Sequence, residues 1–186
     1  SDPVTYNSQG TFVITWTYDD GNGNTTQQTQ TVIVDDVTAP VADVPVLPNV
    51  TGECSATATA PTATDNCVGA VTGTTSDPVT YTTQGTFNIT WTYDDGNGNT
   101  SQQTQTVIVD DVTAPVADVP VLPNVTGECS ATVGSAPTAT DNCVGVVTGT
   151  TSDPLTYNTQ GTFVITWTFD DGNGNTSQQT QTVIVD

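Results

Sequence analysis

Three kinds of side chain are missing from this sequence, which has no lysine, no arginine and no histidine. Its 20 aspartate and glutamate residues therefore give a formal net charge of −20 at pH 7, and nothing in the chain can neutralise these carboxylates. A chain of this charge is repelled by nucleic acids and by anionic membranes, so we expect neither as a partner. The absence of histidine and lysine also removes the commonest catalytic groups, which argues against an enzyme.

The sequence also lacks long apolar runs. None approaches the ~20 residues that cross a bilayer as a helix, so membrane insertion is not expected. Aromatic residues make up only 6% of the chain, and strong acidity with few aromatics is typical of disordered segments. Here, however, the aromatic residues recur at fixed places, and that regularity indicates folded repeats.

What the sequence does contain is one passage written three times. Trp16, Trp91 and Trp167 lie 75 and 76 residues apart, in GTFVITWTYDDGNGN, GTFNITWTYDDGNGN and GTFVITWTFDDGNGN. A fixed period of this size predicts an array of small domains. We expect full repeats at 36–110 and 111–186, and only the second half of a repeat at 1–35. A half-repeat is too short to bury a core alone, so we expect a longer polymer or completion by strand donation from a neighbouring chain.

The clearest predicted strand of a repeat surrounds the tryptophan. Phe87, Ile89 and Trp91 alternate with polar residues and so share one face of a strand. Tyr93 continues this face, and its replacement by phenylalanine in the third repeat indicates a core ring. Asn88 lies on the opposite face and is valine in the other two copies, as expected at a solvent-exposed position.

The rest of the repeat predicts further strands and turns. A hairpin turn, Asp-Asp-Gly-Asn-Gly-Asn, leads into a closing strand over 102–109. Shorter strands are predicted over 53–60 and 69–75, and the proline-rich stretch 38–48 is typical of an edge strand or an extended lead-in. Together these patterns predict an all-β chain of tandem immunoglobulin-like β-sandwich domains in a linear array.

Each full repeat contains two cysteines, Cys54 and Cys67 in one and Cys129 and Cys143 in the next. An even number at nearly the same spacing predicts one disulfide within each repeat, formed in an oxidising, extracellular compartment. A zinc site is a poor alternative, because the chain has no histidine and no Cys-x-x-Cys spacing.

The order DxTAP … C … ATDNC … GTFxITWTYDDGNGN … QTVIVD resembles the hyalin repeats and related immunoglobulin-like repeats of extracellular surface proteins. The resemblance covers both full repeats, and it implies an extracellular or cell-surface location. It departs from those families at the cysteines, both of which lie here in the first half of the repeat. The acidic, proline-ended linker 110–115 is also similar to the linkers of cadherins.

Acidic segments are predicted to meet at one pole of each domain. In an immunoglobulin-like sandwich the linker, the Asp-Asn turn and the Asp-Asp-Gly-Asn-Gly-Asn hairpin lie at the same end. Ca²⁺ takes six to eight oxygen ligands of these types, so we expect calcium sites there. The candidate ligands are Asp19, Asp20, Asn22, Asn24, Asp35, Asp36, Asp65, Asn66, Asp94, Asp95, Asn97, Asn99, Asp110, Asp111, Asp141, Asn142, Asp170, Asp171, Asn173 and Asn175.

Simpler interpretations of the same residues stay open. Asp-Gly and Asn-Gly pairs are what tight hairpin turns require, and the linker aspartates could be solvated charges. A carboxylate pair such as Asp65 and Asp95 could serve a hydrolase, although its recurrence in every repeat suits a scaffold better. Glu53 and Glu128, which share one place in the repeat, could complete the site of the next junction.

Glycans are a further candidate modification. Sequons for N-glycosylation occur at Asn24, Asn49, Asn88, Asn99, Asn124 and Asn175. Asn99 is also a candidate metal ligand, so these two roles compete at that residue.

The sequence thus predicts an extracellular structural protein, a calcium-stiffened array of repeats that forms a filament or the stalk of a surface adhesin. Its expected partners are neighbouring copies of the same chain. The alternative is an adhesive module that binds carbohydrate or another surface through many weak contacts.

Overall fold

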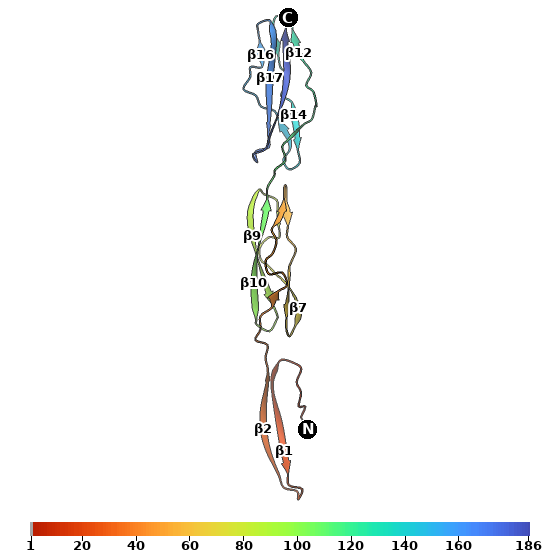
Figure 1. Cartoon of the computed structure of the whole chain (residues 1–186), viewed down its shortest axis with the longest axis vertical. Helices are drawn as coiled ribbons and strands as arrows, with labels where there is room; N and C mark the ends of the chain where they lie inside the picture. The colour runs from red at the N-terminus through yellow and green to blue at the C-terminus, as the bar shows by residue number, and fades with distance from the viewer. Residues whose placement is uncertain (1) are drawn as a thin grey trace. The chain divides into compact units, whose positions relative to one another are not determined.

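The computed structural model describes residues 2–186, and in that range the chain consists of strands joined by turns and irregular segments (Figure 1). By its internal contacts it divides into two compact units. The first holds the residues up to Leu47 with Ala60–Ser76 and Thr90–Thr104, and the second holds Pro48–Thr59, Asp77–Ile89 and Gln105–Asp186. The described residues include no helix long and apolar enough to cross a membrane.

The first unit contains a long hairpin and a small sheet. Strands β1 (Gly10–Asp19) and β2 (Thr25–Val34) pair antiparallel over their whole length. The sheet has the order β3-β6-β7, formed by Val41–Ala42, Thr62–Asp65 and Gly69–Thr72. Ala63 and Val71 of this sheet pack with Tyr93, which is buried as predicted for a core ring.

Strands β9 (Gly85–Asp94) and β10 (Thr100–Val109) run through both units. They confirm the predicted strand around Trp91 and the predicted closing strand. Ile89 and Trp91 are buried, whereas Asn88 is exposed. The second unit also contains β4 (Val50–Gly52), which pairs parallel with the end of β10, and the pair β5 (Ala56–Thr57) and β8 (Thr80–Tyr81).

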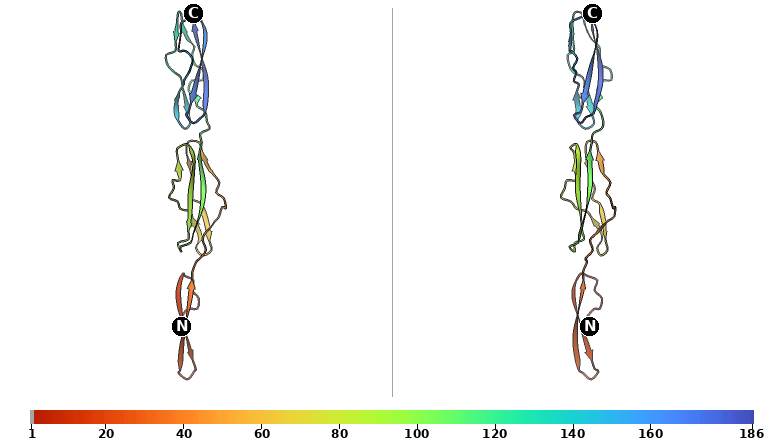
Figure 2. Two further views of the ribbon diagram at one scale, coloured as in Figure 1. Left: turned by 90° about the vertical axis from the view of Figure 1, so that its left-hand side faces the viewer. Right: turned by 60° about the vertical axis from the view of Figure 1, so that its left-hand side comes forward.

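The third repeat lies wholly in the second unit and shows the complete architecture (Figure 2). Its largest sheet has the order β12-β18-β17, formed by Val125–Gly127, Thr176–Val185 and Gly161–Asp170. A second sheet has the order β11-β14-β15, formed by Val116–Ala117, Thr138–Asp141 and Gly145–Thr148. The strands β13 (Ala131–Thr132) and β16 (Thr156–Tyr157) form a third, two-stranded pair.

These sheets enclose one apolar core. Ile165 and Trp167 from β17 pack in the same cluster as Ala139 and Val147 from β14 and β15. Alternate residues of β17 face this cluster, as the two-residue period of a half-buried strand requires. Both layers are antiparallel except for the parallel pair of β12 and β18. Packing of two such layers around one core is the arrangement of a β-sandwich, so the predicted all-β, immunoglobulin-like fold class is confirmed.

The predicted strand over 53–60 is wrong, because only the short β5 forms there. The chain turns back at Gly52, where a Cβ atom would lie 2.0 Å from the backbone oxygen of Ser55. That approach leaves room for glycine alone, and the resulting bend interrupts an extended strand. Gly127 and Ser130 repeat the same bend at 2.0 Å in the third repeat.

Candidate metal centre

The hairpin turn of the third repeat fixes one buried carboxylate. Gly172 and Gly174 adopt φ values of 81° and 109°, a region that glycine enters without strain. The turn thus wraps around Asp171, whose Oδ1 accepts hydrogen bonds from the backbone N–H groups of Asn173 (2.7 Å) and Asn175 (3.1 Å). The same residues can therefore form a tight hairpin turn and hold a carboxylate in place.

The asparagine side chains of this turn extend to the linker. Asn173 donates from Nδ2 to Asp111 Oδ2 at 3.0 Å. Asn175 donates from Nδ2 both to the backbone oxygen of Asp111 and to Asp171 Oδ2, each at 2.8 Å. The amide nitrogens thus orient the two aspartates. A glycan on Asn175 would modify the nitrogen that makes these bonds.

A third carboxylate comes from the turn after β14. Asp141 Oδ1 accepts the backbone N–H groups of Cys143 (2.8 Å) and Val144 (2.9 Å). Its other oxygen, Oδ2, is buried and has no hydrogen-bond partner. Since an unsatisfied buried charge is costly, this atom is available to a further ligand.

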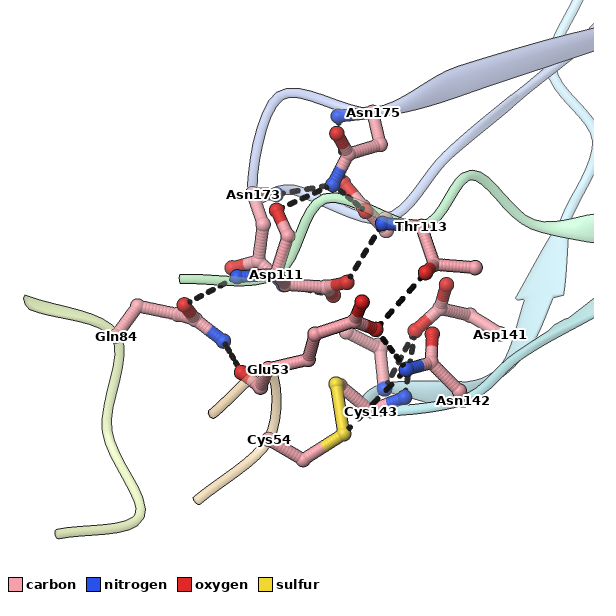
Figure 3. Close-up of a disulfide and its surroundings, with 12 residues drawn as sticks. Glu53, Cys54, Gln84, Asp111, Thr113, Asp141, Asn142, Cys143, Asn173 and Asn175 are labelled. Carbon is pink, nitrogen blue, oxygen red and sulfur yellow. Dashed lines mark hydrogen bonds between the residues drawn. A yellow bond between two sulfur atoms is a disulfide. The ribbon is translucent and has the colours of Figure 1, made fainter. Parts of the chain in front are cut away.

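We call Asp111, Asp141 and Asp171 the junction cluster; Figure 3 labels the first two of these aspartates. All three side chains are buried, and each offers a carboxylate oxygen that lies within 4.8 Å of the others. The sequence contains no cationic side chain that could offset them. Clustered carboxylate oxygens with one orphaned acceptor fit a hard divalent cation such as Ca²⁺.

Asp171 is held in its charged form. Burial raises its pKa, but the hydrogen bonds from the Asn175 side chain and from the backbone N–H groups of the turn outweigh burial, so the pKa lies below its ordinary value of 3.8. The carboxylate of Asp171 is therefore ionised at neutral pH.

The first unit repeats the arrangement around the linker that precedes the second repeat. Asp36, Asp65 and Asp95 are all buried, and Asp65 Oδ2 is again without a partner. Asn97 donates to Asp36 Oδ2 at 3.2 Å, and Asn99 donates to the Asp36 backbone oxygen at 3.0 Å. The buried aspartates and their asparagine bonds thus recur in both full repeats, although in the first unit the ligand atoms within 4.8 Å of one another come from Asp36, Asp65 and Cys67.

Cys67 also lies at this first cluster. Its Sγ is within 4.8 Å of carboxylate oxygens of Asp36 and Asp65. Local desolvation at this cluster and the negative charge of Asp36 raise the pKa of its thiol.

The other predicted ligands are placed differently. The predicted residues outside the two clusters and their asparagine partners are exposed, namely Asp19, Asp20, Asn22, Asn24, Asp35, Asn66, Asp94, Asp110, Asn142 and Asp170. Asp19 and Asp20 belong to none of the groups of acidic or cysteine side chains that residues 2–186 form. Their role as ligands stays a prediction.

Glu53 of the second repeat lies beside the junction cluster. One of its carboxylate oxygens lies within 4.8 Å of an oxygen of Asp111. Glu53 Oε2 accepts hydrogen bonds from Thr113 Oγ1 (2.8 Å) and from Asn142 Nδ2 (2.7 Å), both in the third repeat. Glu53 of the second repeat is thus hydrogen-bonded to the third repeat beside the junction cluster.

Gln84 completes this connection and was not among the predicted residues. It donates from Nε2 to the Glu53 backbone oxygen at 2.9 Å and accepts the backbone N–H of Asp111 at 2.8 Å (Figure 3). The signal that could have revealed it is its recurrence, because Gln9 and Gln160 hold the same place in the other copies.

A disulfide joins Cys54 to Cys143, with a Cα–Cα distance of 4.9 Å. It links the second repeat to the third, so the predicted pairing within each repeat, Cys54–Cys67 and Cys129–Cys143, is wrong. Cys67 and Cys129 are free.

The third repeat shows why its two cysteines do not meet. Cys129 follows β12, whose last residue, Gly127, pairs with Val185 at the end of β18. Cys143 follows β14 at the pole of the hairpin turn, where β18 begins at Thr176. A ten-residue strand is roughly 30 Å long, so closeness in sequence is not closeness in space.

The chain is similar in sequence to a known protein. No family model matches the chain. Hyalin of Strongylocentrotus purpuratus is 34% identical over 205 residues, an alignment that covers 98% of this chain and 17% of hyalin. The chain resembles hyalin over nearly its whole length, as expected of an extracellular repeat protein. It spans about a sixth of the length of that relative.

Two solved structures are similar at a lower level. The structure of mouse clustered PcdhgC3 EC1-3 gives a TM-score of 0.37 at 10% identity, covering 95% of this chain and 76% of that one. A Ca²⁺-stabilised adhesin of an Antarctic bacterium that binds ice gives 0.29 at 18% identity, covering 95% and 57%. These TM-scores are too low to establish a shared fold.

Proposed function

We propose that this hyalin-like chain is a structural segment of an extracellular adhesion protein, an array of immunoglobulin-like domains that Ca²⁺ stiffens at the junctions. The array would serve as an adhesin stalk or as the subunit of a filament, without enzymatic activity. The observation that carries the proposal is the junction cluster, and above all the orphaned, buried Asp141 Oδ2.

The composition of the cluster supports calcium in particular. Ca²⁺ prefers carboxylate, carbonyl and amide oxygens and tolerates irregular geometry. Asp111, Asp141 and Asp171 would hold the ion, and Glu53 would add an oxygen from the preceding repeat. A bound cation supplies the positive charge that the chain itself lacks, and it ties the linker to the turn and to the hairpin.

The recurrence of the cluster supports a structural role over a catalytic one. The same buried set stands at Asp36, Asp65 and Asp95, as expected if each domain contributes one junction. On this proposal the folding domains are 36–110 and 111–186, and their partners are further copies of the repeat.

Thermal unfolding of the full chain in millimolar Ca²⁺ and in EDTA tests the proposal. Ca²⁺ at 100 times its Kd should add about 2.7 kcal/mol to the free energy of unfolding, which raises the Tm by several degrees. An unchanged Tm would remove calcium from the proposal.

A pair of matched variants assigns the effect to the cluster. Asp141→Asn removes the orphaned charge, so it should raise the Tm in EDTA and abolish most of the calcium response of the third repeat. Asp118→Asn makes the same change in charge at an exposed aspartate of the third repeat that is not a predicted ligand, and it should respond to Ca²⁺ like the parent chain. Equal responses of both variants would contradict the assigned site.

The proposed stiffening has its own measurement. Electron microscopy of longer arrays should give a larger persistence length in Ca²⁺ than in EDTA. Equal persistence lengths would argue against a mechanical role for the ion.

A further inference from the structure

Each full repeat has two cysteines, which we call its first and second positions. The disulfide joins the first position of one repeat to the second position of the repeat that follows it. Cys54 is the first position of the second repeat and Cys143 is the second position of the third repeat. The two free cysteines are Cys129, the first position of the third repeat, and Cys67, the second position of the second repeat. Both free thiols are exposed.

We propose that Cys67 and Cys129 are covalent attachment sites for further copies of the repeat. Cys129 takes the second-position cysteine of a following copy, and Cys67 takes the first-position cysteine of a preceding copy. Each junction of the array would then carry one disulfide, in a continuous ladder. This inference rests on the array in the proposed function, but it does not depend on calcium.

The loop that carries Cys129 is already built like the loop that carries Cys54. β4 pairs parallel with the end of β10, and β12 pairs with the end of β18 in the same register. The backbone N–H of Asp110 donates to the backbone oxygen of Gly52 at 3.0 Å, and the backbone N–H of Asp186 donates to the backbone oxygen of Gly127 at 2.9 Å. Cys129 is thus presented in the conformation in which Cys54 forms its bond.

The residues that form hydrogen bonds between repeats beside the Cys54–Cys143 disulfide have counterparts beside the two free cysteines. Glu53 Oε2 accepts hydrogen bonds from Thr113 and Asn142 of the next repeat. Glu128 holds the same place before Cys129. Thr38 and Asn66 hold the places of Thr113 and Asn142 at the other free position.

The turn that carries Cys67 matches the turn that carries Cys143. Asp65 Oδ1 accepts the backbone N–H groups of Cys67 (2.8 Å) and Val68 (2.9 Å), as Asp141 does at its own turn. In the bonded junction the amide of Asn142, the counterpart of Asn66, donates to Glu53 Oε2. The Asn66 amide instead donates to Cys67 Sγ at 3.4 Å. The Asp65 turn therefore offers the same surface with no loop bound to it.

Bond formation requires an oxidant, and a low-molecular-weight disulfide such as oxidised glutathione is sufficient. The Cys129 thiolate attacks one glutathione sulfur, forms a mixed disulfide and releases one glutathione thiolate. The thiolate of the incoming cysteine then attacks Cys129 Sγ and releases the second. Two protein thiols are oxidised, one glutathione disulfide is reduced to two thiols, and the two protons pass to the released thiolates.

The test extends the full chain. A copy of residues 36–110 is added after Asp186, which aligns with Asp110, in a Cys67→Ser background. The chain is oxidised with glutathione disulfide and cleaved before aspartate, since trypsin has no site in it. We expect the peptide 118–140, which carries Cys129, to be joined to the peptide 65–76 of the added copy, and one free thiol to remain.

Other pairings would overturn the proposal. A bond between peptides 118–140 and 141–152 would mean that Cys129 pairs within its repeat, and three free thiols would mean that the new junction stays open. Near-ultraviolet circular dichroism of the tryptophans establishes that the chain is folded. As a control, Cys129→Ser in the extended chain should leave the added copy's Cys67 counterpart free.

The unextended chain distinguishes the source of the partner. After oxidation, a disulfide-linked dimer that joins Cys129 to the Cys67 of another chain would show that a separate chain can supply the repeat. Monomers alone, together with the expected bond in the extended chain, would restrict the ladder to successive repeats of one polypeptide. If Cys129 forms no disulfide with a second-position cysteine in either experiment, the proposal is refuted.

Discussion

The β1–β2 hairpin and the β17–β18 hairpin have almost the same sequence and a very different environment. They share their register, with Trp16 opposite Gln28 and Trp167 opposite Gln179. Each indole nitrogen also donates to the glutamine two residues further on, at 3.0 Å and 3.2 Å. Yet Trp16 is 41% exposed and Trp167 only 2%. The hairpin is therefore determined locally, whereas burial of its apolar face requires the other half of the repeat.

The largest expected effect comes from removing the buried ring. Trp167→Ala should lower the free energy of unfolding of the third repeat by about 3–5 kcal/mol, because it deletes a buried aromatic side chain and leaves a cavity. Trp16→Ala, the matched change in the exposed hairpin, should cost about 1 kcal/mol or less. Urea titration followed by far-ultraviolet circular dichroism measures both. Equal losses would show that the two hairpins are buried alike.

The two hairpins can also be compared in acid, through Asp171 and its counterpart Asp20. The hydrogen bonds at the turn hold the pKa of Asp171 below 3.8 although burial opposes this, and the Asn24 side chain and turn N–H groups lower the pKa of Asp20. A folded-state pKa that is depressed contributes stability above the unfolded value, and this stability is lost as the pH falls through the folded value. The third repeat should therefore lose stability below about pH 4.

Asp171→Asn tests that dependence. It should lower the pH slope of third-repeat stability between pH 4 and pH 2 by up to one proton, and it should weaken the repeat at pH 7. Asp20→Asn changes the same place in the half-repeat and should leave the third-repeat transition unaltered. Urea titrations in EDTA at several pH values provide the measurement, and an unaltered slope in Asp171→Asn would contradict the assignment.

The smallest expected effect is on the outer face of the hairpin. Val13 and Val164 are both exposed, and the second repeat has Asn88 at that position. Val164→Asn should therefore change the free energy of unfolding by about 0.5 kcal/mol or less. A loss above 1 kcal/mol in the same titration would mean that this face is covered.

Local features of the sequence were sufficient to predict the long strands and the turn. The alternation around Trp91 and the Asp-Asp-Gly-Asn-Gly-Asn motif predicted β9, β10 and the turn between them. Short strands such as β5 carry too few residues for a period to be recognised, and the bend at Gly52 depends on a backbone contact that no spacing reveals.

The grouping of three aspartates in the candidate site was predictable from the sequence, but the links between the two repeats were predictable only in part. The convergence of Asp111, Asp141 and Asp171 follows from strand order in a sandwich. The Cys54–Cys143 bond does not, because it depends on which ends of two successive repeats face one another. Fourteen-residue spacing suggested a local pair, whereas the sheet between Cys129 and Cys143 keeps that pair apart.

The Cys54–Cys143 bond has a mechanical consequence. It spans a sequence separation of 89 residues, which fully extended would measure about 300 Å at ~3.4 Å per residue. A force applied at the two ends of the chain passes through the sulfur–sulfur bond and cannot draw out that length. Under load the segment stays short, even if its strands separate, until a reductant cuts the bond.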